Sequence, residues 1–205
     1  MSGITVHYFD IYGRADVIRM ILHYAGAAFE DHKIQFQEWP QLKGSGFAEF
    51  SQLPIVDVDG HRLAQTQSIS RYLCNKFGYG AAEGEETYWT ESLCDLCEDI
   101  GSTITPLAFN KDFEGLSKVF TEKVPEWLRI IEARLDKNNG GSGYFVGNHP
   151  TRADFHVFAV LHNIIEKFHP ETLEGHNKLR QWKVRFLNSS RTLKTFLETR
   201  EPRDF

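Results

Sequence analysis

A tyrosine near the end of the first apolar segment is the side chain best suited to chemistry. Tyr8 lies in I-T-V-H-Y-F, Ile4 to Phe9, a β-branched and aromatic run that is typical of a strand. Open α/β sheets bind ligands at the carboxyl ends of their strands. A phenol, with an ordinary pKa of about 10, stays protonated where a thiol, at about 8.5, can ionise. Tyr8 could therefore donate a hydrogen bond to a bound thiolate; the alternative is a tyrosine that only fills the core.

The stretch from Ser51 to Leu73 could bind a small peptide with a free carboxylate. Pro54 stands at a strand entrance, a tight hairpin surrounds Asp59-Gly60, and a helix is predicted to begin at Gln65-Thr66. An extended backbone edge can pair with the backbone of a peptide, and a helix N-terminus attracts a negative charge. The two features together predict a binding edge beside a helix start.

Two further clusters lie on one helix expected in the second half of the chain. Cys94 and Cys97 form a C-x-x-C, but inside a helix instead of at a helix start after a strand, so we interpret them as structural cysteines. Asp95, Glu98 and Asp99 are spaced i, i+3 and i+4 and share one face. That acidic face is either solvated, or attracts a ligand ammonium, or binds a divalent cation weakly across a symmetric dimer.

The elements that position these residues indicate two domains. The first, residues 1–78, reads strand-helix-strand and then strand-strand-helix, the order of a thioredoxin-like α/β domain. Its predicted elements are strands Ile4–Phe9 and Phe29–Phe36, helix Arg14–Ala25, a polar loop Glu38–Ser51, strands Ile55–Val58 and Arg62–Ala64, and helix Gln65–Phe77.

A glycine-rich linker over residues 79–85 leads to a second domain, residues 86–205, that is predicted to be an all-α helical bundle. Thr151 and Asp154 form a capping box at the start of one of its helices. The predicted helices are Thr87–Phe109, Leu116–Lys137, Thr151–Lys167, His176–Asn188 and Thr192–Thr199.

Composition excludes several classes of protein. The net charge of -5 and the absence of a basic run argue against nucleic acid as a partner. No apolar stretch approaches the roughly 20 residues of a membrane span, and the N-terminus lacks the pattern of a signal peptide. Three cysteines without framework spacing favour a reducing compartment, so we expect a cytoplasmic protein.

Together these residues resemble the cytosolic glutathione transferases, in particular the sigma class and the related glutathione-dependent prostaglandin D synthases. The resemblance covers nearly the whole chain and rests on the order and spacing of short motifs. The motifs are Y-F-D-x-x-G-R-A-D-x-I-R from Tyr8, F-E-D from Phe29, W-P-x-x-K from Trp39, Q-L-P-I-V-D-V-D-G from Gln52, R-Y-L from Arg71, G-Y-F-V-G-N from Gly143 with T-x-A-D, and E-x-R-E-P-x-x-F at the end.

The resemblance implies a homodimeric enzyme that joins the glutathione thiolate to small hydrophobic electrophiles. Tyr8 would stabilise the thiolate, and Arg14 would support Tyr8 or its surroundings. The implied glutathione-binding residues are Tyr8, Trp39, Lys43, Gln52, Leu53 beside a cis Pro54, Gln65, Thr66 and Asp99 of the partner subunit. Alignment on R-Y-L assigns the family's Gln-Ser pair to Gln65-Thr66 and not to Gln67-Ser68.

Two parts of the chain depart from the family pattern. The loop between Lys43 and Gln52 is longer than expected, and one member of the acidic cluster at which prostaglandin synthases can hold a divalent cation is Glu98. The apolar substrate is expected to meet the loop from Phe9 to Gly13, the segment Ile104 to Phe109, and Phe205.

Three alternatives remain beside conjugation. A prostaglandin D isomerase would use the same glutathione site. A non-catalytic crystallin-like relative would carry a spoiled site or an insertion, and neither is visible. A thiol oxidoreductase would need a cysteine near the end of the first strand, where this chain has Tyr8-Phe9-Asp10.

Overall fold

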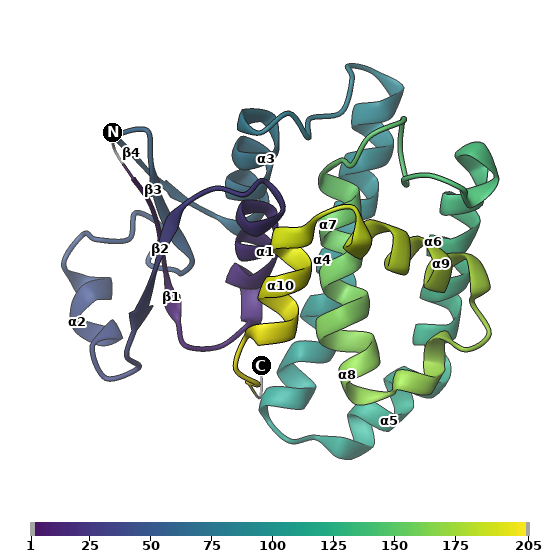
Figure 1. The fold of residues 1–205 in the computed structure, drawn as a ribbon. Helices are drawn as coiled ribbons and strands as arrows, with labels where there is room; N and C mark the ends of the chain where they lie inside the picture. Colours follow the sequence, from purple (N-terminus) through teal and green to yellow (C-terminus); the bar gives the residue numbers. More distant parts are fainter. Residues whose placement is uncertain (1–2, 204–205) are drawn as a thin grey trace. The chain divides into compact units, whose positions relative to one another are not determined.

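The computed structural model describes residues 3–203, which form two compact units (Figure 1). The first unit contains the described residues up to Gly78 together with those from Ser190 onward. The second unit spans Tyr79–Ser189.

A four-stranded sheet forms the centre of the first unit. The strands are β1 (Ile4–Phe9), β2 (Phe29–Ile34), β3 (Ile55–Val58) and β4 (His61–Ala64), in the order β2-β1-β3-β4. β1 pairs with β2 in parallel and with β3 in antiparallel fashion, and β3 pairs with β4 as a hairpin. The predicted parallel pair and the predicted hairpin are both confirmed.

Helices cover both faces of this sheet. α1 (Asp16–Tyr24), which follows a 3-10 turn at Gly13–Ala15, and α3 (Thr66–Lys76) pack together on one face. α2 (Trp39–Gly44) lies on the other face (Figure 1). Because successive strand residues point to opposite faces, Tyr8 of β1 faces the side of α1, and His7 faces the side of α2.

The segment that contains α2 corrects the sequence-based prediction. Residues Glu38–Ser51 are predicted to be a polar loop, whereas the structure forms a helix over Trp39–Gly44. Pro40 lies in the first turn of this helix, where a missing N–H costs no hydrogen bond. The helix is short and largely exposed, so it lacks the long apolar stripe by which helices are recognised in a sequence.

The last helix, α10 (Arg191–Thr199), belongs to the first unit. The sequence places residues 86–205 in one helical domain, but α10 instead packs against α1. Phe196 stacks on His23 with ring centroids 3.9 Å apart, Leu193 is fully buried, and Ser190 Oγ donates to the carbonyl of Tyr24. The apolar side of α10 is therefore buried against α1.

The second unit contains no strand among its described residues. Its helices are α4 (Glu85–Phe109), α5 (Phe113–Glu122), α6 (Val124–Lys137), α7 (Arg152–Val160), a π-helical turn (Leu161–Ile165), α8 (Glu166–Phe168) and α9 (Asn177–Asn188), with 3-10 turns at Asn139–Gly141 and Pro170–Leu173. The single helix predicted over Leu116–Lys137 is wrong. The chain breaks at Lys123, because Pro125 begins a new helix and cannot donate a hydrogen bond within the old one.

The predicted capping box at the start of α7 is confirmed. The Asp154 carboxylate accepts hydrogen bonds from the Thr151 backbone N–H at 2.9 Å and from the Thr151 hydroxyl at 3.2 Å. It also accepts from the Phe145 backbone N–H and the Trp182 indole N–H, both at 3.1 Å. Complete burial raises the pKa of Asp154 to about 6. One carboxylate therefore ties the start of α7 to two other segments of the unit.

Cys94 and Cys97 are buried on α4, and neither forms a disulfide. Burial raises the pKa of the Cys97 thiol well above its ordinary value. Because the reactive species of a cysteine is the thiolate, this environment agrees with a structural C-x-x-C. Within residues 3–203, no helix is both long enough and apolar enough to cross a membrane.

Candidate functional site

Tyr8 lies near the carboxyl end of β1 and is 7% exposed. Its hydroxyl oxygen accepts a hydrogen bond from the backbone N–H of Arg14 at 3.1 Å. Gly13 passes so close that a Cβ atom there would lie 2.6 Å from the Tyr8 hydroxyl oxygen, and its φ of +43° also favours glycine. The loop after β1 is thus built around the tyrosine hydroxyl.

The environment of Tyr8 keeps its phenol protonated. Burial raises the pKa of Tyr8 above its ordinary value, and this effect exceeds the opposing effects of the Arg14 N–H and of the charges of Arg14 and Arg19. An oxygen that accepts one hydrogen bond retains its own proton for donation, and the accepted bond polarises the O–H. The Arg14 contact comes from the backbone, while the Arg14 side chain is exposed.

The start of α3 lies beside the same loop. Thr66, the first residue of α3, is buried, and its hydroxyl donates to the carbonyl of Arg14 at 3.4 Å. Gln65 precedes it with a φ of 70°, a conformation that costs non-glycine residues free energy. Its side-chain amide donates to Gln52 Oε1 at 3.1 Å, and the Leu53–Pro54 bond is cis. The structure therefore groups Gln52, Gln65 and Thr66, whereas Gln67 and Ser68 lie within the helix.

Trp39 and Lys43 both belong to α2. Trp39 contacts the ring of Phe9 edge-on, with centroids 6.1 Å apart, whereas Lys43 is exposed in the last helical turn. Phe36 stacks on Phe9 with ring centroids 4.4 Å apart and is 55% exposed. Sequence reasoning did not identify Phe36, because the identity of an aromatic residue at the end of a predicted strand does not show whether its ring is buried or exposed.

The predicted acidic residues lie on α4 of the second unit. Asp95 and Asp99 are exposed, and Glu98 is half-buried. In residues 3–203 no three His, Cys, Asp or Glu side chains come together in a way that could hold a metal ion. Of the residues expected to meet an apolar substrate, Ile104 is fully buried and Phe109 is 61% exposed. Phe205 lies outside the described residues.

Two family models match this chain. Residues 4–75 match the N-terminal domain of glutathione S-transferases, and residues 98–200 match their C-terminal domain. The chain belongs to the glutathione S-transferase family. Its thioredoxin-like first unit and its helical second unit are those expected from the motifs.

Individual relatives support the same assignment. A probable glutathione S-transferase 8 of Caenorhabditis elegans is 33% identical over the full length of both chains. The hematopoietic prostaglandin D synthase of Gallus gallus is 30% identical over 76% of each chain. Among solved structures, a monomeric glutathione S-transferase of the hookworm Necator americanus superposes with a TM-score of 0.85, at 28% identity and with complete coverage of both chains. These matches confirm the resemblance to transferases and prostaglandin D synthases.

Proposed function

We propose that this glutathione S-transferase conjugates the thiolate of glutathione to small hydrophobic electrophiles through Tyr8. The observation that carries the proposal is a buried, protonated phenol whose oxygen already accepts the Arg14 N–H. Such a phenol can donate its proton as a hydrogen bond to a thiolate and so stabilise the ionised form of the nucleophile. Arg14 acts as a positioning residue, because its backbone orients the Tyr8 hydroxyl.

The glutathione backbone would bind along the segment from Gln52 to Thr66. Leu53, beside the cis proline, offers a backbone edge for pairing, and Gln52 and Gln65 are already hydrogen-bonded to each other. The first turn of α3, at Thr66, is suited to the γ-glutamyl carboxylate, because helix N-termini attract anions. Trp39 and Lys43 on α2 would contact the glycyl end.

The left-handed backbone of Gln65 gives a test that separates binding from folding. Glycine adopts this φ readily, so we expect Gln65→Gly to change the free energy of unfolding by no more than about 1 kcal/mol. Loss of the Gln65 side chain is expected to weaken glutathione binding about tenfold, the effect of one or two polar contacts. Isothermal titration with glutathione and urea denaturation measure the two quantities.

Gln67→Gly is the matched control, since it removes the same side chain from inside α3. It is expected to lower the stability by about 1 kcal/mol and to leave the glutathione affinity unchanged. A stronger loss of affinity in the Gln67 variant would show that the ligand contact lies at Gln67-Ser68.

We propose a homodimer in which Asp99 of the partner subunit binds the glutathione ammonium. The exposed carboxylate on α4 is suited to that role. The monomeric structure of the hookworm relative makes the oligomeric state of this chain the first measurement. Asp99→Asn is expected to raise the glutathione Kd about tenfold, as for a charge-assisted contact, with Asp95→Asn as the neighbouring control.

Sedimentation analysis at the protein concentration used for the titration shows whether the species that binds glutathione is a monomer or a dimer. A monomeric species that binds glutathione at full strength would contradict the partner role of Asp99.

The proposed dimer would also be required for a divalent cation near Asp95, Glu98 and Asp99. Within residues 3–203 of one chain, no three His, Cys, Asp or Glu side chains come together in a way that could hold a metal ion. Calcium titration of the dimer tests that site.

A prostaglandin D isomerase is the second candidate, favoured by the likeness to the hematopoietic prostaglandin D synthase of Gallus gallus. Both reactions start from the same thiolate, so an assay with glutathione, an aryl halide and a prostaglandin endoperoxide decides between them. Conjugation of the aryl halide without endoperoxide turnover supports a transferase of the detoxifying type. Absence of both activities would favour a non-catalytic, crystallin-like relative. The presence of all the proposed site residues from Tyr8 to Thr66 argues against that outcome. A cytoplasmic location accords with glutathione as the co-substrate and with three cysteines that form no disulfide.

A further inference from the structure

The turn that orients the Tyr8 hydroxyl is held by a residue from the far end of the chain. The 3-10 turn Gly13–Ala15 carries the backbone N–H that donates to Tyr8, and Tyr12 and Asp16 flank this turn. Arg200, which directly follows α10, contacts both flanking residues. One guanidinium therefore joins the two ends of the turn on which the geometry of Tyr8 depends.

Both contacts of Arg200 are well shielded from water. Its Nη1 donates to Asp16 Oδ2 at 2.7 Å, and the carbon of its guanidinium lies 3.9 Å from the centroid of the Tyr12 ring. The Asp16 side chain is 1% exposed and the Arg200 side chain is 11% exposed. Ion pairs and cation–π contacts are stronger where solvent is excluded, so these contacts can restrain the turn.

The position of Arg200 is itself fixed by the packing of α10 on α1 (Figure 1). The backbone N–H of Arg200 donates to the carbonyl of Phe196 at 2.9 Å. Phe196 stacks on His23 of α1, and Leu193 is fully buried. The guanidinium therefore extends from the end of a packed helix.

The residues that follow Arg200 add contacts on the same side of the loop. The Tyr12 hydroxyl donates to the carbonyl of Glu201 at 2.9 Å and accepts from the backbone N–H of Arg203 at 3.2 Å. The Arg203 guanidinium donates to Asp10 Oδ1 through Nε at 3.3 Å and through Nη2 at 3.2 Å. The chain from Arg200 to Arg203 thus follows the loop after β1.

Arg19 reaches the loop from within α1. Its Nη1 donates to the carbonyl of Ile11 at 2.8 Å and lies 4.0 Å from Asp16 Oδ1. Its Nε donates to the carboxylate of Asp31 on β2 at 3.1 Å. Because Arg19 also ties α1 to β2, its replacement would disturb the sheet. Arg200 is the residue through which the turn can be tested without changing that link.

We propose that Arg200 is a positioning residue for the thiolate chemistry. By holding both ends of the turn, it keeps the Arg14 N–H directed at the Tyr8 oxygen. The inference rests on the proposed function of Tyr8, because Arg200 acts on the glutathione thiol only through that hydroxyl. Without Arg200 the turn moves more freely, and the Tyr8 hydroxyl spends less time in the orientation that stabilises the thiolate.

The ultraviolet absorbance of the thiolate of bound glutathione, followed against pH in the full-length protein, tests the proposal. In Arg200→Gln we expect the pKa of the bound thiol to rise by about half a unit to one unit, so that the thiolate fraction below that pKa falls about three- to tenfold. The kcat/KM for an aryl halide should fall by the same factor. The Kd of S-hexylglutathione, which has no thiol, should stay unchanged. Arg191→Gln makes the same change at the exposed start of α10 and is the control.

The Tyr8→Phe background separates positioning from a direct effect of the Arg200 charge. Adding Arg200→Gln to Tyr8→Phe should raise the thiol pKa no further, because the hydroxyl that Arg200 positions is gone. A further rise of similar size would show that the charge acts on the thiolate directly, and would overturn the proposal. A wild-type thiol pKa in Arg200→Gln, beside a raised one in Tyr8→Phe, would overturn this inference alone. An unchanged thiol pKa in Tyr8→Phe would refute the proposed function as well.

A second variant guards against a failure to fold. Arg200→Gln leaves the buried Asp16 carboxylate without the charge of its partner, a change that strongly destabilises proteins. The double variant Asp16→Asn, Arg200→Gln carries no charge at either position and still removes the cation from the Tyr12 ring, while Arg19 keeps Asp31 as its partner. It should show the same rise in thiol pKa. A wild-type thiol pKa in the folded double variant would overturn the proposal whether or not Arg200→Gln folds.

Discussion

Tyr8→Phe is expected to lower the turnover of an activated aryl halide by about ten- to a hundredfold near neutral pH, with little change in glutathione affinity. The hydroxyl stabilises the thiolate more than the thiol, so its loss raises the pKa of bound glutathione by about one to two units. At a pH below the thiol pKa, each unit by which that pKa rises lowers the fraction of ionised glutathione about tenfold. Affinity is expected to persist because the backbone edge at Leu53 and the helix start at Thr66 remain intact.

The pH–rate profile is the decisive measurement for Tyr8. In the Tyr8→Phe variant, the acidic limb of kcat/KM should shift to higher pH, and the rates of the two proteins should converge above the new thiol pKa. Tyr72→Phe is the matched control, because the Tyr72 hydroxyl donates to Asp59 on the hairpin and has no part in the proposed site. Unchanged turnover in Tyr8→Phe, or a lower rate without a shift of the profile, would refute the proposed role.

The fold could be predicted from the sequence wherever local signals agree with the tertiary structure. The strand Ile4–Phe9 is found with its predicted bounds, because an alternating β-branched run and a Tyr-Gly break both mark it. The capping box at Thr151 and Asp154 was predictable because it is a contact within four residues. α2 was missed because a short, exposed helix carries little apolar periodicity. The break at Lys123 was missed for the opposite reason, since the apolar spacing of Leu116, Phe120, Val124 and Leu128 continues across it.

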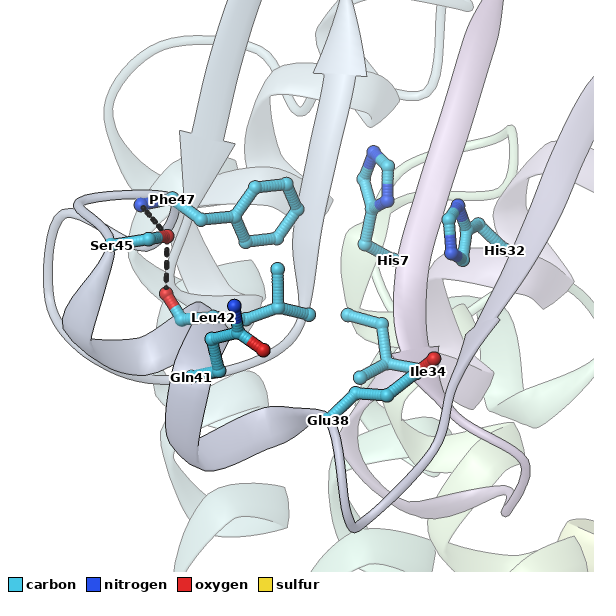
Figure 2. Close-up of a pocket in the computed structure, with 8 residues that line it drawn as sticks. All are labelled: His7, His32, Ile34, Glu38, Gln41, Leu42, Ser45 and Phe47. Atoms are coloured by element: carbon cyan, nitrogen blue, oxygen red, sulfur yellow. Dashed lines mark hydrogen bonds between the residues drawn. The ribbon is translucent and has the colours of Figure 1, made fainter.

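The candidate site was predictable as residue types but not as geometry. The motifs pointed to Tyr8 and to Gln65-Thr66, yet they did not reveal that the Arg14 contact comes from the backbone. The close approach of Gly13 to the Tyr8 hydroxyl also depends on how the loop folds back. A pocket between the sheet and α2, lined by His7, His32 and Leu42 among others (Figure 2), was not predictable, since it combines side chains from two strands and a helix that only the fold brings together.

The largest effect on stability is expected from Asp154→Asn, at about 4 kcal/mol of lost unfolding free energy. One oxygen of this fully buried carboxylate accepts from Phe145 and Trp182, and the other accepts from the backbone and the hydroxyl of Thr151. The asparagine side chain keeps one acceptor oxygen, but its NH2 group takes the place of the other oxygen and faces two buried donors. Those two donors lose their acceptor. Urea denaturation followed by circular dichroism measures the change.

Two variants of Thr151 calibrate that result, because each changes one part of the capping box. Thr151→Ser keeps the hydroxyl and loses a buried methyl group, and Thr151→Val keeps the shape and loses the hydroxyl; each is expected to cost about 1 kcal/mol. A cost for Asp154→Asn no larger than that of Thr151→Val would mean that the links to Phe145 and Trp182 contribute nothing. A cost near 4 kcal/mol would instead show that Asp154 holds the start of α7 against the neighbouring segments of the second unit, beyond its role as a local helix cap.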